Sequence, residues 1–252
     1  IAVLTGHKAK EVLAEGGAKV VVAESEGREV RIACDAILCA VGRVANTAGY
    51  GLEELGIPVT KQRTVQVDEF LATPFPNIYA CGDVCSPYQF THAADFMARI
   101  VIQNALFKGR KRASALVIPW STYTSPEPAH VGRTAGRAQS ARIAIDTYTQ
   151  RLTGVDRAIL DGEDEGFVRI HVRQGTDEIV GATIVAAHAG DLICELSLAM
   201  TQHIGLGRIA GAIHPYPTQA EAIRKVGDLY RHTRLTPFVK CLFARWLAWQ
   251  RS

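Results

Sequence analysis

The chain has 252 residues, 48% of them hydrophobic and 21% charged, which is typical of a globular protein with one large or two ordinary domains. A net charge of +3 and the absence of a long basic run argue against a nucleic-acid-binding protein. No stretch approaches the roughly 18 uninterrupted apolar residues of a transmembrane helix. The sequence therefore predicts a globular protein, with cytoplasmic localisation as the default.

The cysteines do not indicate a metal site. They form no C-x-x-C pair, and their spacing suits neither a zinc site nor a secreted disulfide scaffold. Reduced thiols are the expected state. A disulfide between Cys81 and Cys85 is the less favoured alternative, because Cys81 falls in a predicted buried strand. The six cysteines are Cys34, Cys39, Cys81, Cys85, Cys194 and Cys241.

The first 45 residues show strand signals. The chain starts at Ile1, without methionine, inside a strand-like run, which is typical of a fragment. Residues 20–23 are rich in valine, Glu26-Gly27 marks a turn, and Val30 and Ile32 alternate with charged residues, so a hairpin is expected. Residues 35–41 predict a continuous apolar strand that stops at Gly42-Arg43.

The next 70 residues lead to a strand, a turn and a helix. Residues 52–57 predict one or two helical turns with Gly56 at the end, and Val65 and Val67 alternate as in a strand. Residues 78–81 are short and apolar, which predicts a buried strand. Apolar residues then recur at helical spacing over 92–107, behind Thr91, and Gly109 is expected to close this helix.

Gly82 and Asp83 follow the predicted strand directly. In open α/β sheets, ligands bind beyond the carboxyl ends of strands. A glycine there lets the backbone approach a ligand, and an aspartate offers two acceptor oxygens to hydroxyl donors. The alternative is a strand followed by an ordinary Asx turn. The new helix at Thr91, His92 and Ala93 favours a binding site, because free backbone N–H groups point at an electron-rich ligand.

From about residue 116 the pattern changes to strands followed by helices. Residues 116–123 are strand-like and Pro126 and Pro128 interrupt them. A helix is expected over 134–142, strands over 143–148, 167–172 and 179–186, and an amphipathic helix over 191–203. The glycine-rich run 205–211 does not match the dinucleotide fingerprint and predicts a loop. This order favours an antiparallel sheet with helices on one side.

Two further segments have open interpretations. Residues 214–221 read His-Pro-Tyr-Pro-Thr-Gln-Ala-Glu, in which Pro217 and Thr218 are typical of a helix cap. The last segment places apolar residues on one helical stripe, with Lys240 and Arg245 outside it. Such a helix can lie on a membrane, or pack against a partner subunit or the chain's own sheet, and the packing interpretations are favoured. The apolar residues are Phe238, Val239, Leu242, Phe243, Trp246 and Leu247.

Residues 73–84, followed by 90–94, resemble the second flavin-binding motif of the class I pyridine nucleotide-disulfide oxidoreductases. That family includes dihydrolipoamide dehydrogenase, glutathione reductase and mercuric reductase. The resemblance implies an α/β plus α+β fold, the end of a two-dinucleotide-binding-domain flavoprotein followed by an antiparallel dimerisation domain. Residues 1–45 would then end the NAD(P)-binding domain, 46–115 would end the FAD-binding domain, and 116–252 would form the interface domain.

The resemblance also implies roles for individual residues. Gly82 and Asp83 would meet the ribityl chain of FAD, and the backbone at Thr91, His92 and Ala93 would face the pyrimidine end of the flavin. For the His92 side chain alone, a structural place at the helix start is favoured over an acid-base role.

The family's other motif has an acid-base histidine before Pro-Thr and a glutamate that orients it. Here Tyr216 takes that position, as in mercuric reductases, while Glu221 is kept and His214 lies two residues earlier. A tyrosine of pKa ~10 is a poor base near neutrality, but it can donate a hydrogen bond or ligate a soft metal. Mercuric reductases also carry a C-terminal cysteine pair, whereas this chain has only Cys241 near its end.

The function implied is an FAD-dependent oxidoreductase that passes electrons from NAD(P)H through the flavin to a disulfide, thiol, metal ion or related acceptor. The chain would be its C-terminal half, inactive alone and homodimeric through the last domain. The alternative is a non-catalytic dimerisation module. The sequence names neither the acceptor nor the choice between NADH and NADPH.

Overall fold

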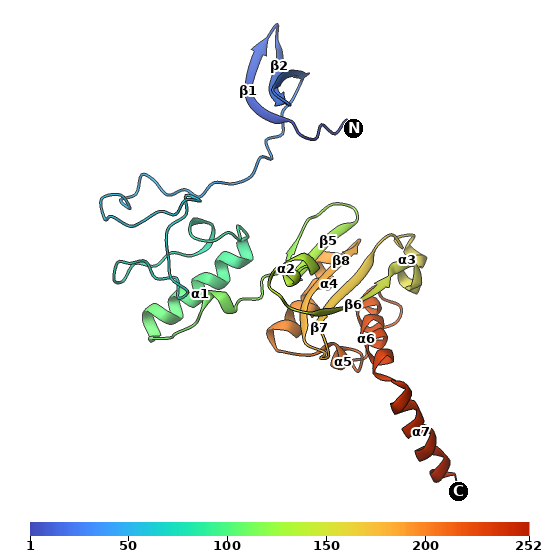
Figure 1. The fold of residues 1–252 in the computed structure, drawn as a ribbon. Coiled ribbons are helices and arrows are strands. Elements are labelled where there is room, and N and C mark those ends of the chain that lie inside the picture. Colours follow the sequence, from blue (N-terminus) through green and yellow to red (C-terminus); the bar gives the residue numbers. More distant parts are fainter. Residues whose placement is uncertain (252) are drawn as a thin grey trace. The chain divides into compact units, whose positions relative to one another are not determined.

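The computed structural model describes residues 1–251. It has two compact units, one ending at Val44 and one beginning at Ala45 (Figure 1). The first contains a three-stranded sheet, and the second contains a long helix followed by a five-stranded sheet with its own helices. Mixed α/β architecture with antiparallel sheets confirms the predicted fold class. No helix in residues 1–251 is both long and apolar enough to cross a bilayer.

The first unit is an antiparallel meander of β1 (Lys8–Glu15), β2 (Ala18–Ser25) and β3 (Arg28–Cys34). The predicted hairpin over β2 and β3 is confirmed, and Glu26 (φ 52°) and Gly27 (φ 76°) make its turn. Two residues with positive φ match the twist of the flanking strands. The sequence missed β1, although Gly16 and Gly17 connect it to β2 through a turn of the same kind.

The predicted strand over residues 35–41 is wrong. These residues are exposed and have no assigned strand. An apolar run becomes a strand only if another strand accepts its backbone hydrogen bonds, and none of the described residues pairs with it. The strand-like run at the first residues stays unpaired for the same reason.

Residues 45–115 contain turns and one long helix. Residues 52–56 form a turn that Gly56 (φ 63°) closes, without an assigned helix. The strands predicted at Val65 and at 78–81 are wrong: each region makes only an isolated bridge, Val59 to Val65 and Ala72 to Tyr79. Residues 78–81 are half-buried, since no ladder of neighbouring strands covers them.

The helix α1 (Thr91–Phe107) confirms the predicted helix with a start one residue earlier. Lys108, with φ 53°, takes the left-handed position that the sequence assigned to Gly109. Gly109 is required for space instead, because a Cβ there would lie 2.8 Å from the Gln103 carbonyl oxygen. Two 3-10 turns, η1 (Gly82–Val84) and η2 (Ala113–Ala115), flank the helix.

The second sheet has the strand order β4-β5-β8-β7-β6, and all its pairs are antiparallel. The three predicted strands are confirmed as β6 (Ile145–Arg151), β7 (Phe167–Arg173) and β8 (Ile179–Ala186). The strand predicted over 116–123 shrinks to β4 (Trp120–Ser121). The prolines expected to break the sheet instead introduce β5 (Glu127–Gly132), which contains Pro128.

Helices α4 (Ala189–Thr201) and α6 (Glu221–Arg234) pack against the sheet, α4 on β5 and β8 and α6 on β6 and β7. Ile170 and Ile184 of the sheet and Leu196 and Ile223 of these helices are fully buried in the shared core. Shorter helical elements complete the domain: α2 (Ala135–Ser140), η3 (Leu152–Gly154), α3 (Asp156–Asp161) and α5 (Leu206–Ile209).

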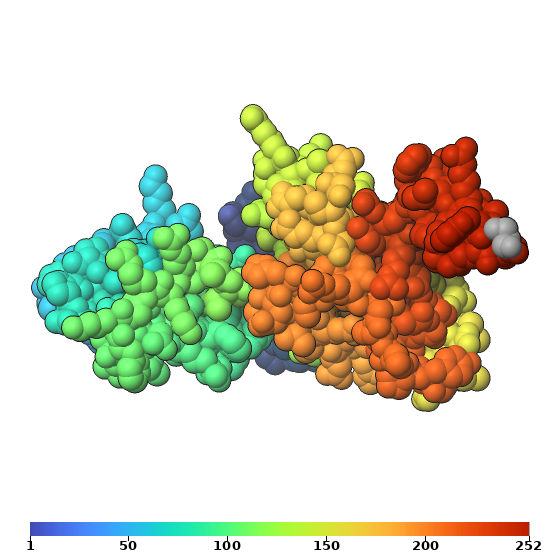
Figure 2. Space-filling model, turned by 90° about the horizontal axis from the view of Figure 1, so that it is seen from below, coloured from blue at the N-terminus to red at the C-terminus, as the bar shows by residue number. Residues whose placement is uncertain are grey.

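Three details at the C-terminal end differ from expectation. The run 205–211 contains α5 rather than only a loop. Thr218 does not cap α6, because its hydroxyl donates to the Pro215 carbonyl at 2.7 Å. The last helix, α7 (Pro237–Gln250), is capped by Thr236 and has no buried residue. Its side chains form a solvent-exposed lobe, coloured red in Figure 2.

Candidate functional site

The turn η1 places Gly82 and Asp83 against the start of α1. Gly82 is buried and has φ 75°, and a Cβ on it would lie 2.8 Å from the Ala94 Cβ. Only glycine suits both the backbone conformation and this approach. The amide of Val65 donates to the Val84 carbonyl at 2.8 Å, which fixes the turn from the other side. Asp83 is therefore held, half-buried, beside a helix start.

The N-terminus of α1 offers backbone donors. Phe90 precedes the helix with extended backbone and makes no side-chain cap. The first helical bond runs from the Ala94 amide to the Phe90 carbonyl, at 3.0 Å. The amides of Thr91, His92 and Ala93 thus precede the helical ladder and are available to an acceptor ligand.

This donor set fits a flavin. The carboxylate of Asp83 can accept hydrogen bonds from the hydroxyl groups of a ribityl chain. Helix amides with the positive end of the helix dipole suit an electron-rich pyrimidine edge. The structure thus brings Gly82, Asp83 and the helix start together as the sequence predicted.

The His92 side chain points to a structural partner. Its Nε2 lies 2.8 Å from the Pro119 carbonyl oxygen, and its ring stacks on Phe90 with centroids 5.3 Å apart. What His92 can offer to a ligand at the helix start is therefore its backbone amide. The ring connects α1 to the segment that enters the second sheet.

Cys81 and Cys85 flank the turn as free thiols. Burial, and secondarily the nearby Cys81, raise the pKa of Cys85 to about 11. At neutral pH Cys85 is a protonated thiol and not a nucleophile. Cys85 also lines an apolar pocket of about 320 Å³ with Leu71, Met97 and Ile118.

The second predicted site contains Tyr216, which is exposed. Its hydroxyl donates to Asp156 Oδ2 at 2.8 Å, and the residue is 70% exposed. This hydrogen bond, followed by the charge of Asp156, raises the pKa of Tyr216 above its usual value. The phenol therefore remains a neutral hydrogen-bond donor at physiological pH.

Glu221 and His214 each have a different partner. Glu221 accepts from Arg224 at 2.8 Å and lies 3.6 Å from Lys225. His214 is 7% exposed in its side chain, and its Nε2 lies 3.1 Å from Glu195 Oε1. The predicted trio does not form one hydrogen-bonded cluster within this chain.

Sequence reasoning missed Asp156 and Glu195. Asp156 stands at the start of α3, where an acidic residue is ordinary, and Glu195 lies within the apolar pattern of α4. Both partners are more than fifteen positions away in sequence from the residues they bind. Only the fold pairs them, so no local signal could have identified them.

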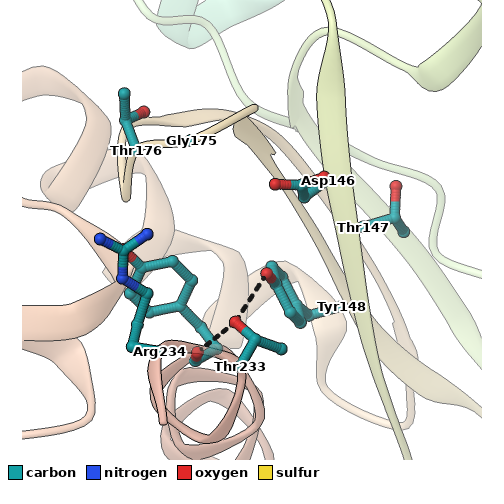
Figure 3. Close-up of a pocket in the computed structure, with 8 residues that line it drawn as sticks. Asp146, Thr147, Tyr148, Gly175, Thr176, Thr233 and Arg234 are labelled. Carbon is teal, nitrogen blue, oxygen red and sulfur yellow. Dashed lines mark hydrogen bonds between the residues drawn. The ribbon is translucent and has the colours of Figure 1, made fainter. Parts of the chain in front are cut away.

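A second pocket, larger than the one beside Cys85, lies elsewhere. It measures about 450 Å³ and is lined by Asp146 and Tyr148 of β6 and by Thr233 and Arg234 of α6. Figure 3 shows the Tyr148 hydroxyl directed at Thr233, 3.3 Å apart. None of the predicted site residues lines it. No group of three His, Cys, Asp or Glu within residues 1–251 is placed to hold a metal ion.

Comparison with known proteins identifies the family. The pyridine nucleotide-disulphide oxidoreductase model matches residues 1–98, and the model of that family's dimerisation domain matches residues 118–226. Mercuric reductase from Streptomyces lividans is 34% identical over 194 residues, 77% of this chain and 41% of the relative. Dihydrolipoyl dehydrogenase from Bacillus subtilis is 32% identical over 201 residues, 80% of this chain and 42% of the relative.

The crystal structure of LpdA from Mycobacterium tuberculosis has a TM-score of 0.81 at 27% identity, covering 89% of this chain and 48% of that one. The chain thus spans less than half the length of each of these proteins. Members of the family use FAD and NAD(P)H. Two models of one family, matched in order along the chain, agree with the turn, the helix and the antiparallel sheet described above: the chain belongs to the pyridine nucleotide-disulphide oxidoreductases.

Proposed function

We propose that the chain is the C-terminal half of an FAD-dependent oxidoreductase that moves electrons from NAD(P)H through the flavin to a disulfide, thiol, metal ion or related acceptor. The observation that supports this most directly is the juxtaposition of Asp83 with the uncapped start of α1. The order of the two family models along the chain supports it independently.

In this proposal the chain's residues bind and orient the flavin. Asp83 accepts hydrogen bonds from the ribityl hydroxyls, and Gly82 lets η1 and α1 approach each other. The amides of Thr91, His92 and Ala93 face the pyrimidine end and favour negative charge there. When bound, FAD would supply the redox chemistry, and the chain's residues would only bind and orient it.

Asp83→Ala tests the flavin assignment. Loss of charge-assisted hydrogen bonds should weaken FAD binding about 10- to 100-fold in the full-length protein. The matched control is Asp95→Ala, at an exposed aspartate of α1 that forms an ion pair with Arg99, and this variant should leave FAD binding unchanged. Flavin absorbance per mole of protein after dialysis measures both. Equal flavin content in the two variants would contradict the proposal.

We further propose that the protein is a homodimer through residues 118–226, in which residues 214–221 of one subunit reach the flavin of the other. The match to a dimerisation domain supports this arrangement. So does the exposure of Tyr216, which an approaching partner could cover. Glu221, near the base of this segment, would keep its place through Arg224.

In the dimer, Tyr216 would act as a neutral hydrogen-bond donor or soft-metal ligand and not as a base. Its raised pKa supports this role. Tyr216→Phe should slow the acceptor half-reaction about 10-fold or more, the usual contribution of a positioned polar group, while reduction of the flavin by NAD(P)H stays nearly unchanged. Stopped-flow measurement separates the two steps. Tyr123→Phe, also at an exposed tyrosine, is the control. An unchanged acceptor step in Tyr216→Phe would make the residue a packing element.

A further inference from the structure

The end of the chain differs from the rest in charge and exposure. Five of the 28 Lys and Arg residues follow Asp228, and none of the 25 Asp and Glu residues does. The same segment contains two of the three tryptophans, Trp246 and Trp249. In α7 every residue except Val239 is exposed, including Trp246 at 48% and Trp249 at 72%. Large exposed aromatic side chains on a cationic helix need a partner of particular chemistry.

Large apolar residues of α7 lie on one side of the helix, and smaller residues lie on the other. When positions are spaced by about 100° around the helix axis, the large apolar side chains fill roughly half of the circumference. Lys240 borders this apolar arc at one edge and Arg245 borders it at the other. The opposite side holds Pro237 and the small side chains of Cys241, Ala244 and Ala248, and the last residue, Gln250, falls within the arc. The apolar arc consists of Phe238, Val239, Leu242, Phe243, Trp246, Leu247 and Trp249.

This arrangement suits a lipid surface. Aromatic and aliphatic side chains can enter the boundary between headgroups and acyl chains, while flanking Lys and Arg stems reach outward to anionic headgroups. Each such cation adds to the attraction of an anionic leaflet. A helix of 14 residues is about 21 Å long, too short to span a bilayer, so it would lie in the plane of the interface.

Two other partners for the apolar arc of α7, the chain's own sheet and a second copy of the chain, fit less well. The chain's own sheet does not cover α7, since none of the helix is buried. If α7 lay on the axis of a two-fold pair of copies, the two helices would meet each other. That would bring Lys240, Arg245 and Arg251 of both copies together without any acidic residue of α7 to balance them. The charge of the helix therefore favours an anionic partner over a second copy of α7.

We propose that α7 binds the full-length protein to anionic phospholipid membranes by inserting its apolar arc at the membrane surface. This inference does not depend on the proposed redox function. It concerns a helix that shares no residue with the turn at Gly82 or with the segment 214–221.

The test uses full-length protein with bound flavin and two kinds of vesicle, phosphatidylcholine alone and phosphatidylcholine mixed with phosphatidylglycerol. Co-sedimentation should show binding to the mixed vesicles and at least about tenfold weaker binding to the neutral ones. Added salt should weaken binding to the mixed vesicles. Tryptophan fluorescence should shift to the blue on binding, because Trp246 and Trp249 leave water.

Matched variants test the apolar arc. Trp246→Glu and Ala248→Glu change the charge equally, but the first lies on the arc and the second lies opposite it. Trp246→Glu should weaken vesicle binding roughly tenfold or more, whereas Ala248→Glu should weaken it only a fewfold. Both should retain flavin and NAD(P)H oxidation, since neither lies at the proposed redox site. Removing residues 236–252 should abolish vesicle binding while the rest of the domain keeps its fold, because α7 adds nothing to its core.

Three results would overturn the proposal. The first is no binding to either kind of vesicle, and the second is equal loss in Trp246→Glu and Ala248→Glu. The third is a change from dimer to monomer in Trp246→Glu during sedimentation without vesicles, which would identify a second copy as the occupant. Loss of flavin has no part in these outcomes, so a failure of the redox assignment can be distinguished from a failure of this one.

Discussion

The second sheet and the flavin segment, residues 45–115, are stabilised in different ways. In the sheet, five strands pair with one another, and helices α4 and α6 cover one face. Its core contains completely buried side chains such as Leu152 and Ile170. In the flavin segment, isolated bridges replace strands, and small clusters form around Leu71, Met97 and Ile57.

The difference shows what a self-contained domain requires. Every strand of the sheet has its hydrogen-bonding neighbour within residues 120–186. The apolar run at 78–81 has a single bridge, through Tyr79, so its side chains remain half-buried. A chain that spans less than half the length of its relatives can complete one domain and leave another dependent on contacts from elsewhere.

The largest expected effect is in the core of the sheet. Ile170→Ala should lower the free energy of unfolding by about 2–5 kcal/mol, because it deletes a fully buried side chain and leaves a cavity. Ile159→Ala, at an isoleucine that is 53% exposed, should cost less than about 0.5 kcal/mol. Urea unfolding at one fixed protein concentration measures both variants.

Ile100→Ala, in α1, tests whether the flavin segment has a weaker core than the second sheet. Ile100 is 6% exposed, but its cluster has only four buried members and can collapse around a smaller side chain. We expect about half of the Ile170 cost or less. If Ile100→Ala destabilised the protein as much as Ile170→Ala, the flavin segment would be a core as complete as that of the sheet, and the contrast would disappear.

Sequence patterns predicted the sheet better than the flavin segment for a physical reason. The spacing of apolar residues shows which segments can form strands, but a segment becomes a strand only when a neighbouring strand pairs with it. For β6, β7 and β8 those neighbouring strands lie within the chain. Residues 35–41 and 78–81 have equally clear patterns, but no neighbouring strand turns them into ladders. Pro128 was misread because a proline within a strand is rare, although its carbonyl still accepts from the Thr122 amide.

In the candidate site, too, contacts between sequence neighbours could be predicted and contacts between distant elements could not. Gly82, Asp83 and the start of α1 are neighbours in sequence, so their juxtaposition could be predicted from local signals. The partners of Tyr216 and His214, Asp156 and Glu195, come from other elements and could not. The sequence also overestimated Thr218 as a helix cap, because its hydroxyl has a nearer acceptor in Pro215.

A glycine comparison tests how tightly η1 and α1 fit. Gly82 and Gly27 have nearly equal φ values, 75° and 76°, but only Gly82 has a close neighbour, with nothing within 4 Å of a Cβ at Gly27. Gly27→Ala should cost about 1–2 kcal/mol from backbone strain alone and leave flavin content intact. Gly82→Ala should cost more and reduce flavin content, since Ala94 and the start of α1 must move. Equal flavin content in both variants would mean that η1 and α1 tolerate displacement.

The smallest expected effect concerns pH and the sheet. His130 and His171 are each 4% exposed. The His130 Nδ1 lies 2.9 Å from the Thr183 hydroxyl, and the His171 Nδ1 lies 2.8 Å from the Thr147 hydroxyl. Burial lowers the pKa of both imidazoles. Arg137 adds to the effect at His130, which a hydrogen bond to Gly132 partly offsets, and Arg169 and His130 add to it at His171.

A lowered folded-state pKa fixes the sign of the pH dependence. Below the unfolded pKa of about 6.5, the unfolded chain binds more protons than the folded one, so stability falls as the pH drops. The urea midpoint should therefore be lower at pH about 5.5 than at about 7.5, by less than the Ile170→Ala shift. His171→Gln should reduce this difference, whereas His232→Gln, at an exposed histidine of α6, should not. A difference that both His171→Gln and His130→Gln left unchanged would show that the acid sensitivity does not come from these two histidines of the sheet.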